Sequence, residues 1–363
     1  MALAYLSERQ TKAVLAEGKE YKVYKDPFFI ALVVMLVLFT GLRTAYNDTY
    51  NYIRMFYDAP TVAEFISDPD NLNIFKNPLY YIFQDSIKEL TGNAQHLIFI
   101  SSLYTQICFL TFFKKYSKHF AQSIFIFVTL GTLAFTLAAL KQVVAMATLT
   151  IAFRFLEKKK WGWYFVFVFI AMLFHTYALA FVLLPLFMQR PWKWFTYIFV
   201  FFMVVLLMNF EEAITSFMDQ AEEVGKVIAD YEVFEDTTTN VMRLAVYAVV
   251  PFISLVFQKW IFHDSTRTEN LLAHMSIISL AFMSMGTQSG ANMFGRMANY
   301  FELGTICILP TMIERTFEKK TARIITVIAA LCFLGFFAYA NAINSSFDAG
   351  YRATSIFSLF KFS

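Results

Sequence analysis

The residues Pro27–Leu42 read PFFIALVVMLVLFTGL, a run of 16 positions without a charged side chain. A helix that crosses the hydrocarbon core of a bilayer needs roughly 17–25 mostly apolar residues, so this run is close to the length of a membrane span. The 26 residues before it mix acidic and basic side chains and lack the apolar core and cleavage site of a secretory signal. We therefore expect a cytoplasmic segment, 1–26, followed by a first membrane helix.

Runs of the same kind recur along the whole chain of 363 residues, which is 58% hydrophobic and contains 44 Phe. This composition is too apolar for a soluble domain. The runs centre on residues 27–42, 95–113, 120–139, 141–156, 162–174, 176–188, 194–209, 241–259, 270–286, 299–313 and 323–341. They predict an all-α polytopic membrane protein with about 11 membrane helices (roughly 10–14), since some runs are short for a perpendicular crossing, in a single membrane domain over 1–363.

The charges between these runs assign the two sides of the membrane. With a cytoplasmic N-terminus and alternating spans, the inner segments hold 20 Lys and Arg against 9 Asp and Glu, whereas the outer segments hold 10 against 18. This distribution follows the positive-inside rule. It places segment 43–93, the acidic segment 210–241 and the tail 342–363 outside. It also requires a break near His175, because one helix over 161–188 would put Arg190 and Lys193 outside.

Two of the outer segments contain amphipathic patterns. Residues 80–90 are too polar to cross the membrane, so we expect an outer amphipathic or re-entrant helix there. The acidic segment carries an apolar stripe at Ile214, Phe217, Met218, Val224, Val227 and Ile228. This stripe predicts a partly helical cap over the outer face, with a solvated loop as the alternative.

The unusual polar residues fall on the same outer side. They are Arg43, Asp48, Tyr52, Lys141, Gln142, His175, Arg243, Arg296 and Tyr300. Ionisable residues near hydrocarbon are costly unless they are paired or face water, so they are candidates for function. Several cations on one face favour an anionic ligand, with phosphate or pyrophosphate suited to arginine, and a histidine near a carboxylate adds proton transfer.

Each of these residues also has a purely structural interpretation. Arg43 could anchor a helix end, Lys141 could mark a turn, His175 could pack in the bundle, and Arg296 could be a solvated loop charge. The pair Asp68 and Asp70 lies in an Asn/Asp/Pro-rich turn, so it does not predict a metal site. The sequence contains no glycine-rich phosphate loop or metal-binding motif, and we expect no cofactor, no metal and no nucleic-acid partner.

Four stretches that contain these residues resemble motifs of one protein family. Residues 41–52 read GLRTAYNDTYNY and resemble the Arg…Asp-Thr-x-x-Tyr segment of EpsG-like proteins, which are bacterial polysaccharide polymerases related to the Wzy O-antigen polymerases. The resemblance continues at Lys141-Gln142-x-x-Ala145, Phe174-His175-x-x-Ala178 and Arg296-x-x-x-Tyr300-Phe301. There are two departures: Lys141 stands where the family usually has Arg, and Asn47 where Gly is common. The first keeps the charge but loses the bidentate fork.

The resemblance implies a GT-C-like glycosyltransferase for capsule, exopolysaccharide or O-antigen. It would join, with inversion, repeat units carried on polyprenyl pyrophosphate, such as undecaprenyl pyrophosphate, at the outer face of the bacterial cytoplasmic membrane. Arg43, Lys141 and Arg296 would stabilise the departing pyrophosphate, while Gln142, Arg243, Tyr52 and Tyr300 would contact substrate. His175 or Asp48 would be the base, and the residues leave both open.

The expected partners are the lipid-linked donor and acceptor glycans, the bilayer and a chain-length regulator. The main alternative is a transporter that moves lipid-linked oligosaccharide across the membrane without glycosyl transfer. A transporter typically places its polar residues near the middle of the bilayer and is often built from repeated halves. Here the polar residues gather at one face, and no internal repeat is visible.

Overall fold

The computed structural model describes residues 1–210, 240–288, 292–343 and 350–361, and these are mostly helical. Residues 211–239, which hold the acidic segment expected to form a cap, lie outside the described residues. The α-helices are α1 (Ala2–Ala16), α2 (Pro27–Gly41), α3 (Thr49–Asp58), α4 (Val62–Ser67), α5 (Pro78–Thr91), α6 (Ala94–Tyr116), α7 (Phe120–Thr129), α8 (Thr132–Ala138), α9 (Leu140–Glu157), α10 (Trp161–Phe174), α11 (Trp194–Met208), α13 (Val241–Val256), α14 (Gln258–Ile261), α15 (Arg267–Met285), α16 (Asn292–Thr316) and α17 (Lys319–Ile343).

Shorter elements connect these helices. The 3-10 helices are η1 (Val23–Lys25), η2 (Pro69–Leu72), η3 (Ile74–Lys76), η4 (Thr176–Phe187) and η7 (Ile356–Phe360). Strand β1 (Arg43–Ala45) pairs antiparallel with β2 (Arg352–Ala353). The expected helix within residues 80–90 is present as α5.

Every apolar run of the sequence falls on a helix or a helix pair, so the all-α class is confirmed. Among the described helices, α6 and α17 are long and apolar enough to cross a membrane. The pair α7 and α8 passes the same test only as one span, and it is bent by 54°. Five further helices, α2, α10, η4, α11 and α13, are apolar but shorter. The number of crossings therefore stays a prediction.

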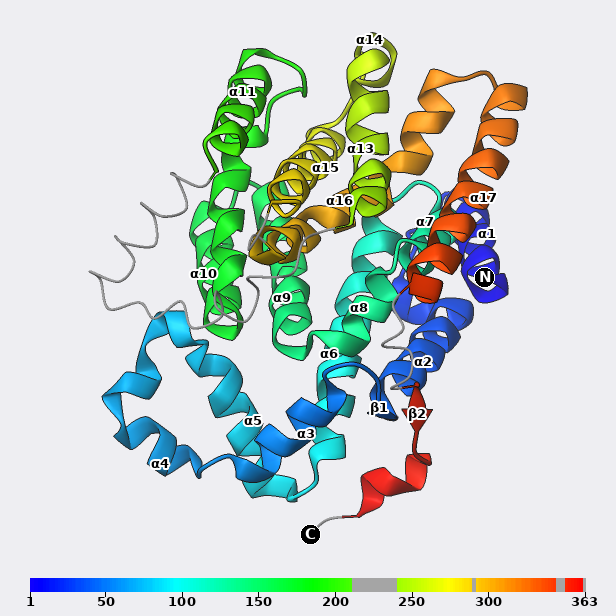
Figure 1. The fold of residues 1–363 in the computed structure, drawn as a ribbon. Helices are drawn as coiled ribbons and strands as arrows, with labels where there is room; N and C mark the ends of the chain where they lie inside the picture. Colours follow the sequence, from blue (N-terminus) through cyan, green and yellow to red (C-terminus); the bar gives the residue numbers. More distant parts are fainter. Residues whose placement is uncertain (211–239, 289–291, 344–349, 362–363) are drawn as a thin grey trace. The chain divides into compact units, whose positions relative to one another are not determined.

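The chain divides into two compact units, Met1–Leu179 with Ala329–Ser363, and Ala180–Ile328. In the first unit, α6 and α10 pack on α9, α2 packs on α6, and α1 packs on α2 (Figure 1). In the second unit, α15 and α16 form the tightest helix pair. The pair approaches closely at Gly304, where an added Cβ would lie 2.5 Å from Cβ of Met275.

The interruptions between helices in the first unit follow from local backbone chemistry. Helix α10 ends at Phe174, and His175 adopts an extended conformation before η4 begins, so the break expected near His175 is present. Asn77 is left-handed with φ 59°, and Pro78 then starts α5 at the position where a missing N–H costs nothing. The run 120–139, expected as one helix, is divided at Gly131, whose φ of 94° is a conformation that glycine adopts readily.

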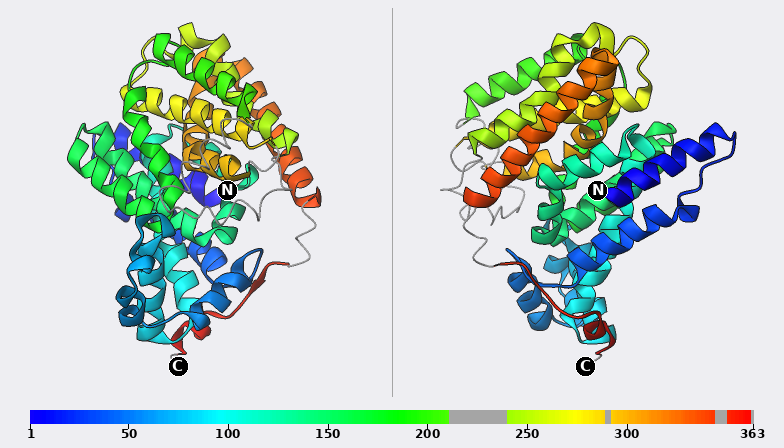
Figure 2. Two further views of the ribbon diagram at one scale, coloured as in Figure 1. Left: turned by 60° about the vertical axis from the view of Figure 1, so that its left-hand side comes forward. Right: turned by 90° about the vertical axis from the view of Figure 1, so that its right-hand side faces the viewer.

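The C-terminal residues 350–361 belong to the first unit and lie against β1. Both views of Figure 2 show this C-terminal segment running beside β1 toward the end of the chain. The N–H of Thr354 donates to the carbonyl oxygen of Leu42 over 2.8 Å and extends the pairing of β1 with β2. The tail and segment 43–93 therefore lie at the same end of this unit.

Candidate functional site

One end of the first unit collects six of the candidate residues. Helix α2 finishes there, α6 and α9 begin there, and α10 stops there, while α3, α4 and α5 of segment 43–93 surround these ends (Figure 1). Helix α5 contacts α3, α4, α6 and α10, and therefore ties the segment to the bundle. Arg43, Asp48, Tyr52, Lys141, Gln142 and His175 belong to this unit, whereas Arg243, Arg296 and Tyr300 belong to the second.

Arg43 is enclosed by protein, with 0% of its surface exposed. Its Nε donates to Oγ1 of Thr49 over 3.3 Å, and its Nη1 donates to the carbonyl oxygen of Thr40 and, over 3.2 Å, to Oγ of Ser102. Burial lowers the pKa of Arg43 to about 10, so its guanidinium stays protonated at neutral pH. None of the described residues offers Arg43 a carboxylate as a counter-ion.

Lys141 lies at the start of α9 against two tyrosines of α5. Its Nζ donates to the hydroxyl of Tyr81 over 2.7 Å and lies 4.2 Å from the centre of that ring and 5.1 Å from the ring of Tyr80. An ammonium over an aromatic face is attracted to the π electrons. As for Arg43, no carboxylate of the described chain pairs with Lys141. Gln142, the next residue, is buried.

A tyrosine cluster, Tyr52, Tyr80 and Tyr81, connects the surroundings of these two cations. The rings of Tyr52 and Tyr80 lie 6.3 Å apart, and those of Tyr80 and Tyr81 lie 5.8 Å apart. Burial raises the pKa of Tyr80 well above its ordinary value, and the charge of Arg43 opposes this effect. Arg43 is therefore close enough to act on Tyr80, whose ring also faces Lys141.

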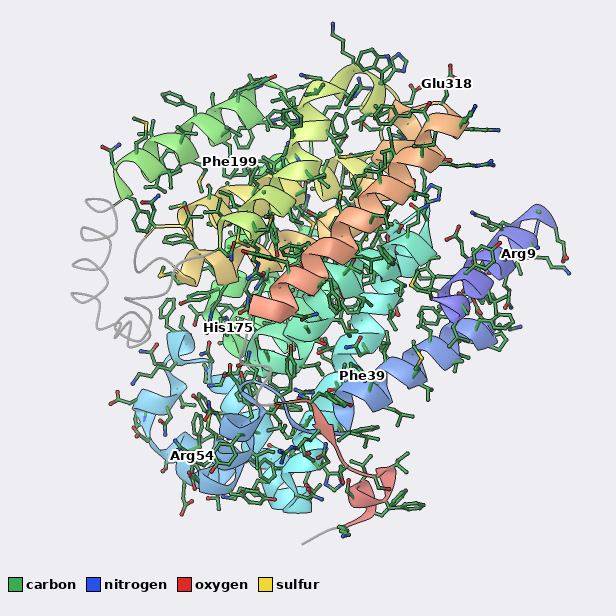
Figure 3. All side chains as sticks on the ribbon, turned by 45° about the vertical axis from the view of Figure 1, so that its right-hand side comes forward. Arg9, Phe39, Arg54, His175, Phe199 and Glu318 are labelled. Carbon is green, nitrogen blue, oxygen red and sulfur yellow. The ribbon has the colours of Figure 1, made fainter. Side chains whose placement is uncertain are left out.

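The two candidate bases occupy different helix ends of the same unit. Asp48 caps the N-terminus of α3 and is half-buried, but its side chain accepts no capping hydrogen bond. His175 follows the last residue of α10, where Figure 3 labels it, and its ring lies edge-on to Tyr177 at 5.0 Å. The N–H of the next residue, Thr176, donates to Oδ1 of Asn77 over 2.9 Å. This bond holds the backbone next to His175 against segment 43–93.

Several cations elsewhere in the first unit are paired, in contrast to Arg43 and Lys141. Lys114, at the opposite end of α6, lies 3.6 Å from a carboxylate oxygen of Asp26, and both side chains are nearly inaccessible. Its neighbour Lys115 bonds Glu157 over 2.6 Å. Both lysines lie in a segment that the charge rule assigns to the inner side, and the pairing of Lys114 with Asp26 accounts for its burial without any ligand.

The second unit holds its own polar network between α13 and α16. Nη2 of Arg243 donates to Oδ1 of Asn299 over 2.8 Å, and the hydroxyl of Tyr247 donates to Oε2 of Glu302 over 2.6 Å. Tyr247 also donates to Asn299 over 3.3 Å, which joins the two pairs into one network. Arg296 lies inside α16, so its alternative interpretation as a loop charge does not hold.

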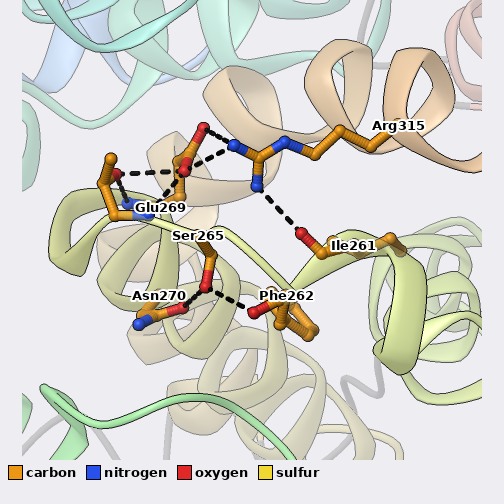
Figure 4. A network of polar contacts seen from close by, with 7 residues as sticks. Ile261, Phe262, Ser265, Glu269, Asn270 and Arg315 are labelled. Atoms are coloured by element: carbon orange, nitrogen blue, oxygen red, sulfur yellow. Dashed lines mark hydrogen bonds and ion pairs between the residues drawn. The ribbon is translucent and has the colours of Figure 1, made fainter.

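A second polar network of this unit fastens α16 to α15. Arg315 bonds both carboxylate oxygens of Glu269, over 2.9 and 3.0 Å, and the carbonyl oxygen of Ile261 over 2.8 Å (Figure 4). Glu269 in turn closes the capping box of α15 with Thr266. Arg315 is therefore another cation of a predicted inner cluster that is neutralised within the protein.

Sequence reasoning missed Asp85 as a member of this region. Asp85 lies on α5, is fully buried, and its Oδ2 has no hydrogen-bond partner among the described residues. Burial raises its pKa to about 6, while Gln84 and Lys88 act in the opposite direction. Asp85 could have been found from the sequence, because it lies four residues after Tyr81 and this spacing places both residues on one face of a helix.

Comparison with known protein families matches residues 27–353 to the EpsG family. The match covers most of the chain and includes all nine candidate residues. No curated protein and no solved structure matches the sequence.

Proposed function

The chain belongs to the EpsG family, and from that membership we propose that it is a membrane-embedded polysaccharide polymerase. The observation that carries the proposal is the pair of cations Arg43 and Lys141, which share one tyrosine cluster and have no carboxylate partner among the described residues. A charge held away from water without a counter-ion is costly. Arg43 is such a charge, and a site that adds the partly buried Lys141 at the same tyrosine cluster is suited to an anionic ligand.

The proposed reaction joins two glycan repeat units, each carried on polyprenyl pyrophosphate, at the outer face of the bacterial cytoplasmic membrane. The oxygen of an acceptor hydroxyl bonds to the anomeric carbon of the donor glycan, while the bond from that carbon to pyrophosphate breaks, with inversion. The hydroxyl proton passes to a base, and polyprenyl pyrophosphate leaves with the bonding electrons. Negative charge grows on the leaving group, so fixed positive charge beside it lowers the barrier.

The described contacts support a division of labour between the two cations. Lys141 is only partly buried, and its ammonium is held by the hydroxyl of Tyr81, so it is the better placed to touch pyrophosphate. Arg43 is enclosed and its Nε and Nη1 are engaged, which favours an action through its electric field. That field is strong because little water screens it.

The remaining candidates take supporting roles in this proposal. Tyr52 and Gln142 contact the sugar, because aromatic faces and amides are common partners of glycan rings and hydroxyls. Arg243, Arg296 and Tyr300 keep the substrate-contact roles that the family resemblance implies. The base is His175 or Asp48. The reaction uses no metal or cofactor, because pyrophosphate is itself a good leaving group.

The decisive experiment uses the purified protein in liposomes with its polyprenyl-pyrophosphate-linked repeat unit. We expect a ladder of glycans that lengthens by whole repeats, together with released polyprenyl pyrophosphate in equal amount to the bonds formed. Lys141→Gln removes a cation of the proposed site and should suppress the ladder. Lys115→Gln removes a lysine that is already paired with Glu157 and is the matched control.

The transporter alternative gives a different result in the same liposomes. A transporter would change the leaflet of the lipid-linked repeat unit while leaving its length unaltered. If the lipid-linked repeat unit moves between leaflets and no glycan ladder forms at a saturating substrate concentration, the polymerase proposal is contradicted.

A further inference from the structure

The C-terminal strand lies in register with the segment that contains Arg43. Across the antiparallel pair, Ala353 stands opposite Arg43 and Arg352 stands opposite Ala45, with an irregularity between the two positions. Residues opposite each other in such a pair have Cα atoms about 4.5–5.5 Å apart. Arg352 is therefore adjacent to the short stretch between Arg43 and Asp48.

Contacts along the tail hold this strand in place. The ring of Tyr351 stacks on Phe39 with centroids 4.7 Å apart, and its hydroxyl donates to the carbonyl oxygen of Phe39 over 2.6 Å. Farther along, the side-chain amide of Asn93 donates to the carbonyl oxygen of Lys361 over 2.9 Å, and a ring nitrogen of His96 bonds the carbonyl oxygen of Leu359. The strand is thus fastened on both sides of Arg352.

The two arginines of the strand pair differ in accessibility. Arg43 is enclosed, and its Nε and Nη1 bond the protein. Arg352 is exposed, and no described residue accepts a hydrogen bond from its guanidinium or pairs with its charge. A free guanidinium presents several N–H donors in a fork that fits phosphate oxygens.

We propose that Arg352 is a pyrophosphate-binding residue, delivered by the C-terminal strand to the segment that contains Arg43. The ligand is the pyrophosphate of a lipid-linked glycan, so the inference rests on the proposed function. Arg352 supplies the bidentate contact that Arg43 is not free to make, and Arg43 supplies fixed charge behind it. The EpsG match includes β2 and ends at residue 353, before η7 begins. The strand that carries Arg352 therefore belongs to the part of the chain that matches the family.

The test measures binding of inorganic pyrophosphate to the full chain in neutral detergent, by calorimetric titration at low ionic strength. Arg352→Ala should weaken binding by roughly tenfold, the loss expected for a hydrogen-bonded contact to a charged group. Arg352→Lys should retain part of the affinity. Arg54→Ala is the control, because Arg54 is also an exposed arginine of the first unit but lies 4.0 Å from Asp58. All variants should keep the thermal midpoint of the parent protein.

The outcomes separate this inference from the proposed function. If Lys141→Gln weakens pyrophosphate binding while Arg352→Ala leaves it unchanged, Arg352 is not a ligand and only the inference falls. If the parent protein itself does not bind pyrophosphate, both fall. An equal loss in Arg352→Ala and Arg54→Ala would indicate general surface charge and would also overturn the inference.

Discussion

The guanidinium of Arg43 and the hydroxyl of Ser102 lie 3.2 Å apart, although 59 positions separate them in the chain. This bond joins β1, which follows α2, to α6 and orients a buried cation. The same guanidinium also bonds Thr40 and Thr49. The charge is therefore held in a fixed position, which is what electrostatic stabilisation of a developing charge requires.

Arg43→Ala should reduce polymer formation about 100-fold, because loss of one preorganised charge contact typically costs about 3 kcal/mol in the transition state. Arg43→Lys should recover part of the activity, since it keeps the charge but not the three bonds. Ser102→Ala, which removes one bond and keeps the charge, should cost much less. The measurement is polymer formed per protein at equal membrane abundance. Normal polymerisation by Arg43→Ala would remove the main physical support for the site.

Lys141 offers a contrast, because the family resemblance places Arg at this position. Lys141→Arg should retain most activity if the residue holds pyrophosphate, whereas Lys141→Gln should lose most of it. Tyr81→Phe removes the hydroxyl that accepts the bond from Nζ and leaves the ring beneath it, so its effect should be intermediate. Polymerisation rates measured over a range of concentrations of the lipid-linked substrate distinguish a pyrophosphate contact from a purely structural role of Lys141. A rate unaffected by Lys141→Gln at all concentrations would show that the lysine only marks a helix start.

The choice between His175 and Asp48 can be made from the acid side of the pH profile. A base must be deprotonated to accept a proton, so activity should fall as the medium is made more acidic. If His175 is the base, His175→Ala should lower turnover with little loss of substrate binding. The remaining activity of His175→Ala should no longer fall as the medium becomes acidic, whereas the activity of Asp48→Asn should still fall. The opposite pattern assigns the role to Asp48.

The sequence predicted the helices well because each apolar run must satisfy its backbone internally. It also predicted the break at His175, from the charges that follow it rather than from any turn residue. The surroundings of the cations were not predictable. Ser102 is an ordinary polar residue inside an apolar helix, and its bond to Arg43 depends on how α2 and α6 pack. Asp85 and Arg352 were missed for the same reason, since burial and strand pairing are tertiary properties.

The sidedness of the membrane remains the premise of every site assignment, and cysteine labelling tests it. Asp70→Cys should react with an impermeant maleimide added to intact cells, because segment 43–93 is predicted to be outside. Ser117→Cys and Lys160→Cys, in the predicted inner clusters, should react only after permeabilisation. Reaction of Ser117→Cys in intact cells would show that the predicted topology is wrong. The proposed location of the site at the outer face would then be wrong as well.

Asp85 is a buried carboxyl group whose protonation should be linked to stability. Its pKa in the folded protein is about 6, above the ordinary value of 3.8, because burial disfavours the charged form. Folding therefore favours the protonated group. The contribution to stability is fully present below about pH 4 and is lost as the pH rises through about 6.

Asp85→Asn keeps the shape of the neutral carboxyl and removes its ionisation. The variant and the parent should have similar thermal midpoints at pH 4, and the variant should become the more stable of the two as the pH is raised to 7.5. Thermal unfolding in detergent at several pH values measures this difference. Asp58→Asn is the control, because Asp58 is an exposed carboxylate on α3. A difference between Asp85→Asn and the parent that stays constant from pH 4 to 7.5 would show that Asp85 does not change its protonation in this range.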